Sequence, residues 1–131
     1  MPTFHLQIVT PDGGFYDGPA EKLIVRALGG DVAILPRHAP YVTALGTGEA
    51  TVVIDGQRRT AACAGGMLAV TQDDVRLVAT TFEWAEDIDK NRAQRAKEEA
   101  ERRIQNAKDA GELEMAKAKL SRALVRLKVG Q

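Results

Sequence analysis

Apolar and polar side chains alternate along the first part of the chain. Phe4, Leu6 and Ile8 share one parity, and His5 and Gln7 stand between them. The same period of two returns over residues 22–27. A period of two is typical of β-strands that have one buried face.

Two tight turns divide later alternating segments into hairpins. Asp55–Gly56 stands between the apolar segments 51–54 and 58–63, and glycine tolerates the positive φ of a two-residue hairpin turn. Residues 72–74 separate another pair of short apolar segments. Short strands at this spacing predict a β-sandwich or a flattened barrel.

From Ala85 onward the apolar period becomes helical. The break at Asp109–Gly111 predicts a turn between two helices, with Gly111 suited to a left-handed cap and Asp87 to an N-cap. The first apolar stripe consists of Ile88, Ala96, Ala100, Ile104 and Ala107. The second stripe consists of Leu113, Ala116, Leu120, Leu124 and Leu127. The expected structure is an antiparallel two-helix hairpin.

Proline and glycine mark a boundary between these two parts. All five prolines lie at or before Pro40, and ten of the twelve glycines lie at or before Gly66. Turn-forming residues therefore belong to the first part. We predict a β-domain over residues 1–84 and a helical domain over residues 85–131. Because the helical stripes are narrow, the hairpin is expected to depend on docking and to be able to leave its dock.

Composition excludes several classes of protein. The 131 residues carry 18 basic and 18 acidic side chains, so the basic excess of a nucleic-acid-binding protein is missing. Cys63 is the single cysteine, which rules out an internal disulfide. We find no signal peptide and no apolar segment of the roughly 20 residues that span a bilayer. Membrane attachment is therefore expected only through a partner.

The familiar catalytic and metal-binding motifs are absent from the sequence. It has no phosphate loop, no C-x-x-C and no H-E-x-x-H. His5 and His38 are interpreted as structural or surface residues rather than metal ligands. Cys63 lies in an apolar strand, which favours a small buried side chain over a nucleophile. We predict neither a catalytic nor a metal site.

The end of the chain is purely basic. Residues 115–131 contain no acidic side chain. The basic residues there are Lys117, Lys119, Arg122, Arg126 and Lys128. They indicate either an acidic partner surface or a solvated face that complements the dipole at a helix C-terminus.

Four segments together point to a known family. They read TPDGGFYDG at 10–18, GGDVAILPRHAPYVTAL at 29–45, AGGMLAV at 64–70 and EWAEDIDKNRA at 83–93. In this order they resemble the epsilon subunits of bacterial F-type rotary ATP synthases, over nearly the whole chain. The resemblance implies a flattened β-sandwich of about ten strands, followed by the helical hairpin.

The resemblance also implies a role. Such subunits are non-catalytic parts of the central stalk that couple the c-ring to the gamma subunit. They lie on the cytoplasmic face of the bacterial cell membrane, attached through the complex. The implied interface residues are Asp31, His38, Ala39, Pro40 and Tyr41. The simpler interpretation of these residues is an ordinary turn and core packing.

In this family the hairpin either folds onto the sandwich or extends along gamma into the catalytic head. The extended form inhibits ATP hydrolysis. Its basic residues, from Lys117 to Lys128, then meet acidic loops of the beta and alpha subunits. Charge-assisted hydrogen bonds suit such a contact.

The segment IDKNRA matches the family's ATP-binding motif, I/L-D-x-x-R-A. The implied ATP-binding residues are Glu83, Ile88, Asp89, Arg92, Ala93, Arg122 and Arg126. ATP, with or without magnesium, would be a regulatory ligand, and no cofactor is required. The alternative is that Asp89 and Arg92 form a surface pair one helical turn apart. Arg122 and Arg126 are placed roughly opposite the leucine stripe, so they reach a ligand only beside the packed seam.

Two other classes of protein remain as alternatives. A coiled-coil interaction or chaperone-like protein would use the hairpin as an arm and form a stable oligomer. A nucleic-acid module would use the basic tail, but neutral total charge and 5% aromatic residues disfavour it.

Overall fold

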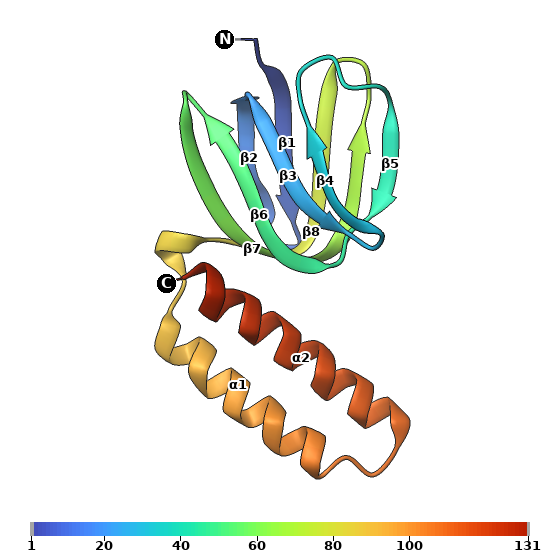
Figure 1. Ribbon diagram of the computed structural model, residues 1–131, viewed down its shortest axis with the longest axis vertical. Helices are drawn as coiled ribbons and strands as arrows, with labels where there is room; N and C mark the ends of the chain where they lie inside the picture. Colours follow the sequence, from blue (N-terminus) through green and yellow to red (C-terminus); the bar gives the residue numbers. More distant parts are fainter. Residues whose placement is uncertain (1, 131) are drawn as a thin grey trace.

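The computed structural model describes residues 2–130. It places a β-domain at one end and two helices at the other, with the N-terminus far from the helices (Figure 1). The strands are β1 Phe4–Thr10, β2 Gly13–Ala20, β3 Lys22–Ala27, β4 Gly30–Ile34, β5 Tyr41–Ala44, β6 Thr47–Ile54, β7 Gln57–Val70 and β8 Asp74–Trp84. A 3-10 turn η1 (Ala85–Asp87) leads to helices α1 (Lys90–Gln105) and α2 (Ala110–Val129).

The strands form one hydrogen-bonded sheet that folds over on itself. Its order is β2-β1-β8-β7-β6-β3-β4, and β5 pairs with β7. All pairs are antiparallel except β1 with β8. Figure 1 shows the two layers, and buried side chains from both form the core cluster between them. The predicted sandwich followed by a helical hairpin is confirmed.

The described residues contain eight strands where about ten were expected, because β7 serves both layers. Its first part pairs with β6 and its last part pairs with β5. The change of partner falls at Gly65 and Gly66, which have φ of +67° and +117°. A Cβ on Gly66 would lie 1.8 Å from the carbonyl oxygen of Val78, so only glycine fits this bend.

Both predicted hairpins are present. Ile54 pairs with Gln57 across Asp55–Gly56, and both turn residues have positive φ. Val70 pairs with Val75 in the second hairpin. The alternating residues of β1 point as expected, since Leu6 and Ile8 are fully buried.

The helix boundaries differ from the sequence prediction by one short turn. Asp89, not Asp87, is the N-cap of α1, and its side chain accepts a 3.0 Å hydrogen bond from the backbone N–H of Arg92. Asp87 lies in the 3-10 turn before it. Gly111 is not a left-handed cap, because it lies in the first turn of α2, whose N-cap is Asp109. The helical domain was predicted to begin at Ala85, which includes this 3-10 turn as well as α1.

Small side chains form the contact between the helices. Ala93 and Ala100 of α1 and Ala116 and Ala123 of α2 are buried. Leu124 was placed in the packing stripe, and this was wrong, since it is 45% exposed. The reason is that α2 has a second contact face, which meets the sandwich.

The hairpin rests on β6 and β7 through a small docking seam. This seam consists of Ala62, Ile88 and Val129, which are buried, with Ala85 and Val125 packed against them. Figure 1 shows the joint end of the hairpin next to the sandwich, while the α1–α2 turn extends away from it. Neither helix described over residues 2–130 is long and apolar enough to cross a membrane.

Candidate functional site: a pocket at the joint

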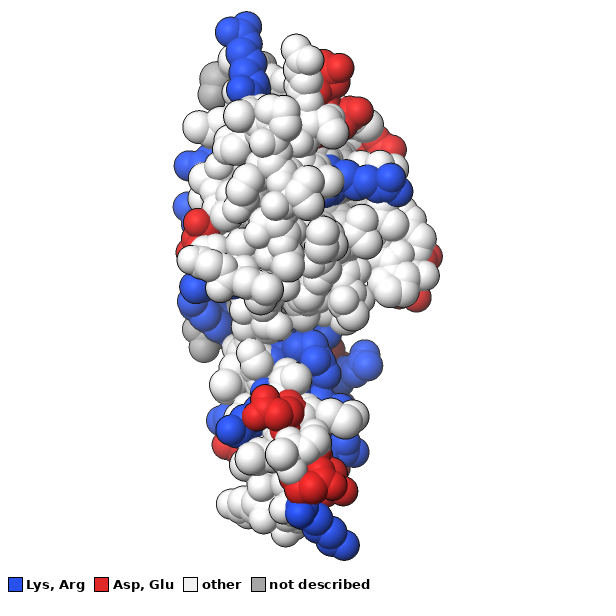
Figure 2. All heavy atoms as spheres, turned by 90° about the vertical axis from the view of Figure 1, so that its right-hand side faces the viewer, with Lys and Arg blue, Asp and Glu red and all other residues white. Residues whose placement is uncertain are grey.

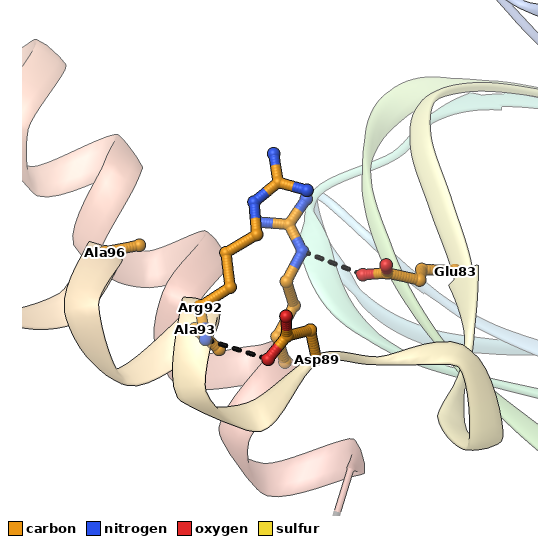
Figure 3. A pocket seen from close by; sticks show the side chains of 6 residues that line it. Glu83, Asp89, Arg92, Ala93 and Ala96 are labelled. Carbon is orange, nitrogen blue, oxygen red and sulfur yellow. Dashed lines mark hydrogen bonds and ion pairs between the residues drawn. The ribbon is translucent and has the colours of Figure 1, made fainter.

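Residues of the segment IDKNRA position the start of α1 against the sandwich. Asp89 caps the helix, so Arg92 and Ala93 fall in its first turn. Ala93 is buried against α2, and Ile88 is buried in the docking seam. The side chain of Arg92 is therefore presented at the joint between helix and sandwich (Figure 3).

A pocket of about 170 Å³ opens at this joint. Three elements supply its walls, namely the end of β8, the start of α1 and the end of α2 (Figure 3). Its lining residues are Glu83, Asp89, Arg92, Ala93, Ala96 and Arg126. Five of the seven residues that the resemblance implied for ATP are thus brought together, and Ala96 joins them.

An ion pair crosses the pocket. Arg126 Nε donates to Glu83 Oε1 at 3.1 Å, and the two side chains are 28% and 35% exposed. Figure 3 shows Arg92 reaching toward the same space. With Asp89, the pocket holds two guanidinium groups and two carboxylates.

These groups suit an anionic, polar ligand. Guanidinium groups donate in forked pairs to phosphate oxygens, and carboxylates accept from amino and hydroxyl groups. Drug-sized ligands usually occupy roughly 300–1,000 Å³. At about 170 Å³ the pocket matches a phosphate group or part of a nucleotide, and a larger ligand has to extend outside it. A phosphate at Arg126 would also have to compete with Glu83.

Two residues of the implied site lie elsewhere. Ile88 is buried in the docking seam rather than lining the pocket. Arg122 lies beside Val125 and Arg126 in a narrow gap against Cys63 and Thr47. Arg126 reaches the pocket because Val125 and Val129, rather than Leu124, face the sandwich.

The implied interface residues fall into two groups at opposite ends of β4. Asp31 lies at its start, where it pairs with Arg26 Nε at 3.0 Å. His38 follows its end, donates from Nδ1 to the carbonyl of Ala39 at 2.8 Å and packs edge-on to Tyr41. Ala39 and Pro40 line an open cleft of about 640 Å³ with Arg37, His38, Gln72 and Asp73.

An apolar surface that the sequence analysis missed connects these two ends. Met67 lies opposite Ala44 on one side and Val78 on the other, with Val42 on the same face. Val42 is 64% and Met67 is 48% exposed. We call Val42, Ala44, Met67 and Val78 the apolar face. Figure 2 shows that charged side chains are sparse over this side of the sandwich.

The apolar face was detectable in principle. Val42 and Met67 are apolar at the parity that points away from the core, and strand 67–70 is apolar on both parities. Leu28 extends the surface toward Asp31, since its N–H donates to the carbonyl of Ala44 at 3.2 Å. Leu28 is also exposed.

The basic residues of the tail do not act as one group. Lys117 and Lys128 are exposed, and Lys117 lies 4.0 Å from Glu114. Lys128 occupies the last turn of α2, where cations complement the helix dipole. Lys119 is half-buried beside a second, more apolar pocket near the α1–α2 turn.

Neither histidine nor cysteine forms a reactive site in the described part of the chain. Cys63 is buried, and burial raises the pKa of its thiol to about 12. His5 donates from Nε2 to Asp17 Oδ1 at 2.5 Å and from Nδ1 to Asp74 Oδ1 at 2.8 Å. The hydrogen bond to Asp17, and then that to Asp74, raises the pKa of His5 above 6.5. Among residues 2–130, no cluster with metal-ligand geometry is found.

Together these features define a β-sandwich that carries a docked helical hairpin, with an anion-compatible pocket at the joint. Known proteins share the two-domain organisation of a β-sandwich followed by helices. The family described as "ATP synthase, Delta/Epsilon chain, beta-sandwich domain" matches residues 3–85, and "ATP synthase, Delta/Epsilon chain, long alpha-helix domain" matches residues 86–131.

Curated relatives agree over the full length. The ATP synthase epsilon chain of Caldanaerobacter subterraneus subsp. tengcongensis is 41% identical, over 97% of this chain and 93% of its own. That of Bacillus velezensis is 44% identical, over 98% of both chains. The chain therefore belongs to the epsilon-chain family of ATP synthases, and it is a non-catalytic subunit.

Solved structures share the fold. A chain from the Euglena gracilis mitochondrial ATP synthase, in a structure of OSCP, F1 and the c-ring, has a TM-score of 0.79. It is 22% identical, over 92% of this chain and 78% of its own. A chain from the central stalk and c-ring of the Tetrahymena thermophila mitochondrial ATP synthase has a TM-score of 0.69 at 13% identity, over 99% and 98%.

Proposed function

We propose that this chain joins the gamma subunit to the c-ring in the rotor of a proton-translocating ATP synthase. It would lie on the cytoplasmic face of the bacterial cell membrane, attached through the complex. The observation that carries this proposal is the apolar face, because an uncovered apolar surface of this kind marks an interaction site. It connects the segment at His38 with the turn at Asp31, so one surface can serve two partners.

Binding to purified gamma subunit tests this part. Val42→Asp places a charge on the apolar face, and we expect at least about a tenfold loss of affinity for gamma, as at an interface hot spot. Met115→Asp is the matched control, because Met115 is equally exposed, at 66%, but lies on the hairpin. Equal binding by the two variants would exclude the apolar face as the gamma-binding surface.

The hairpin is proposed to be the regulatory part. Docked, it leaves rotation free, and released, it extends along gamma and inhibits hydrolysis. The small docking seam supports this, since few buried residues hold the hairpin in place. Lys117, Lys128 and Lys119 are then available to acidic loops of the beta and alpha subunits. In the reconstituted complex, Lys117→Glu with Lys128→Glu is expected to relieve inhibition of ATP hydrolysis.

We also propose that ATP binds at the joint pocket and holds the hairpin docked. The supporting observation is that β8, α1 and α2 all contribute residues, so a ligand there contacts both domains at once. Such a ligand shifts the population toward the docked form by its differential affinity. The chain would then release inhibition when ATP is plentiful.

Calorimetric titration of the isolated chain with ATP, with and without magnesium, tests this site. We expect Arg92→Ala to abolish the binding heat, because it removes a phosphate donor from the pocket. Arg95→Ala is the control, since Arg95 is exposed on the next turn of α1 and does not line the pocket. The absence of binding heat at millimolar ATP would exclude the proposed ATP site and leave the proposed rotor role unaffected.

A further inference from the structure

The linker between the two domains is short and has a defined shape. After Trp84 the chain makes the 3-10 turn Ala85–Asp87, and the N–H of Ile88 donates to the carbonyl of Ala85 at 3.3 Å. Ile88 and Asp89 are extended, with φ, ψ of −74°, 124° and −82°, 102°, and α1 begins directly after them. The hairpin has no other covalent connection to the sandwich.

The side chain of Arg59, in the sandwich, contacts this linker. Strand β7 runs past the end of β8, whose last pair is Trp84 with Ala61. Arg59 is two residues further along β7 on the same face, which places it diagonally across from Trp84. Its guanidinium carbon lies 3.9 Å from the centroid of the Trp84 ring.

The same guanidinium also donates a hydrogen bond to the carboxylate of Glu86. Arg59 thereby stacks on Trp84, the last residue of β8, by a cation–π interaction and contacts the linker inside the 3-10 turn by an ion pair. Trp84 is itself buried, with its ring 5.2 Å from Phe82 and 5.7 Å from Phe15. The front half of the linker is therefore tied to the rigid body of the sandwich.

We infer that Arg59 is a clamp that keeps Trp84–Glu86 on the sandwich when the hairpin is released, so that the hairpin pivots about Asp87–Asp89. This inference rests on the mobile hairpin of the proposed function. With the clamp closed, the flexible tether is about three residues long, and without it the tether begins at Ala85. A shorter tether has less conformational entropy when released, so the clamp favours docking.

The clamp requires arginine. A lysine ammonium is a compact point charge, whereas the planar guanidinium can stack on the indole and still donate to a carboxylate. Asp89, which belongs to the pivot, also lines the pocket at the joint. A ligand in the pocket would thus contact the pivot, whose dihedral angles change when the hairpin is released. Arg59 would confine this change to Asp87–Asp89.

Hydrogen–deuterium exchange of the full chain without nucleotide tests the clamp. Loss of a cation–π contact together with an ion pair is expected to accelerate exchange at the amides of residues 86–88 roughly fivefold in Arg59→Gln. Core amides such as that of Leu77 serve as the internal reference. Arg58→Gln is the matched control, because Arg58 is exposed and forms no ion pair among residues 2–130. Linker exchange that is the same in all three proteins overturns the clamp.

Two further variants separate its parts. Glu86→Gln keeps the ring contact and loses the charge pair, so it should give a smaller acceleration, and Arg59→Lys should resemble Arg59→Gln. Distances between spin labels on the sandwich and near the α1–α2 turn report release of the hairpin. If linker exchange is faster but the spin-label distances show no release, the clamp is supported and the proposal that the hairpin is mobile is rejected. Equal exchange in Arg59→Lys and the wild type overturns the stacking that the clamp requires.

Discussion

The sandwich and the docking seam are held by very different amounts of apolar packing. Eighteen buried residues form the core cluster of the sandwich, and Leu6, Leu68 and Leu77 among them are fully enclosed. The docking seam has three buried residues. Burial stabilises by roughly 25 cal/mol per Å² of apolar surface, so apolar burial stabilises the fold of the sandwich far more than it stabilises docking at the seam. A stable sandwich thus carries a helical hairpin that little apolar packing holds in place.

The hairpin also differs from the sandwich internally. The buried residues between its helices include four alanines, which allow close approach but fill little volume. On the surface of α1, Glu99 accepts from Arg102 at 2.7 Å and from Arg103 at 3.1 Å. Such pairs each add a few tenths of a kcal/mol to a helix. The hairpin should therefore remain helical after release more through local interactions than through a core.

The largest effect is expected in the sandwich. Leu77→Ala opens a cavity in a fully enclosed site and should lower the free energy of unfolding by about 2–5 kcal/mol. Urea unfolding followed by Trp84 fluorescence measures it. The hairpin variants below should leave this transition nearly unchanged. If they shift it as much as Leu77→Ala does, the two regions unfold as one unit and the contrast between them is wrong.

A smaller effect is expected in the docking seam. Val129→Ala removes two methyl groups from a buried contact and should weaken docking by about 1–2 kcal/mol, or roughly tenfold in population. Spin-label distances between sandwich and hairpin measure the released fraction. Leu124→Ala is the control, because Leu124 lies on α2 outside the seam. Equal release by both variants would mean that the seam does not hold the hairpin.

The ion pair of the pocket should contribute less still. Glu83→Gln removes one charge of a partly exposed pair, and we expect docking to weaken by at most about 1 kcal/mol at low salt. The difference from wild type should shrink as salt is added, because screening weakens exposed pairs. The released fraction at two salt concentrations measures it. A salt-independent loss would indicate that Glu83 acts through packing rather than charge.

The smallest effects should depend on pH, in opposite directions in the two regions. Hydrogen bonds to Asp17 and Asp74 raise the pKa of His5, so its stabilisation of the sandwich is complete below pH 6.5 and is lost as pH rises through the folded value. Hydrogen bonds from Arg102 and then Arg103 lower the pKa of Glu99, so its stabilisation of α1 is present above pH 4.5 and is lost as pH falls through the folded value.

NMR titration of the wild type, His5→Gln and Glu99→Gln measures both shifts. Strand amides of β1 and β8 should follow His5, and helix amides of α1 should follow Glu99. A His5 pKa at or below 6.5 would contradict the first expectation. A Glu99 pKa at or above 4.5 would contradict the second.

The strands could be read from the sequence because their signals are local. Alternation at Leu6 and Ile8 and the Asp55–Gly56 turn each depend on neighbouring residues only. The strand count was less accessible, because Gly65–Gly66 bends β7 without ending it. The predicted N-cap Asp87 was wrong, because the chain makes a 3-10 turn over Ala85–Asp87 before α1 begins and Asp89 caps the helix.

The contacts of the pocket and the two contact faces of α2 needed the tertiary structure. The motif predicted Asp89, Arg92 and Ala93 as neighbours, but the contact of Glu83 with Arg126 joins residues 43 positions apart. The helical wheel of α2 favoured Leu124 as a packing residue, because a wheel cannot show that the helix meets two partners. Asp31 and His38 are close in sequence, yet β4 separates them.

The position of the α1–α2 turn, far from the joint, makes the hairpin a lever arm. Helix α2 has 20 residues, and at a rise of 1.5 Å each it is about 30 Å long. A rotation of about 10° at the joint therefore moves the tip by about 5 Å, roughly one helical turn. A rotation that barely displaces Asp89 would therefore change which surface the α1–α2 turn can reach. The distal turn is accordingly the most sensitive place on the molecule to read the angle of the joint.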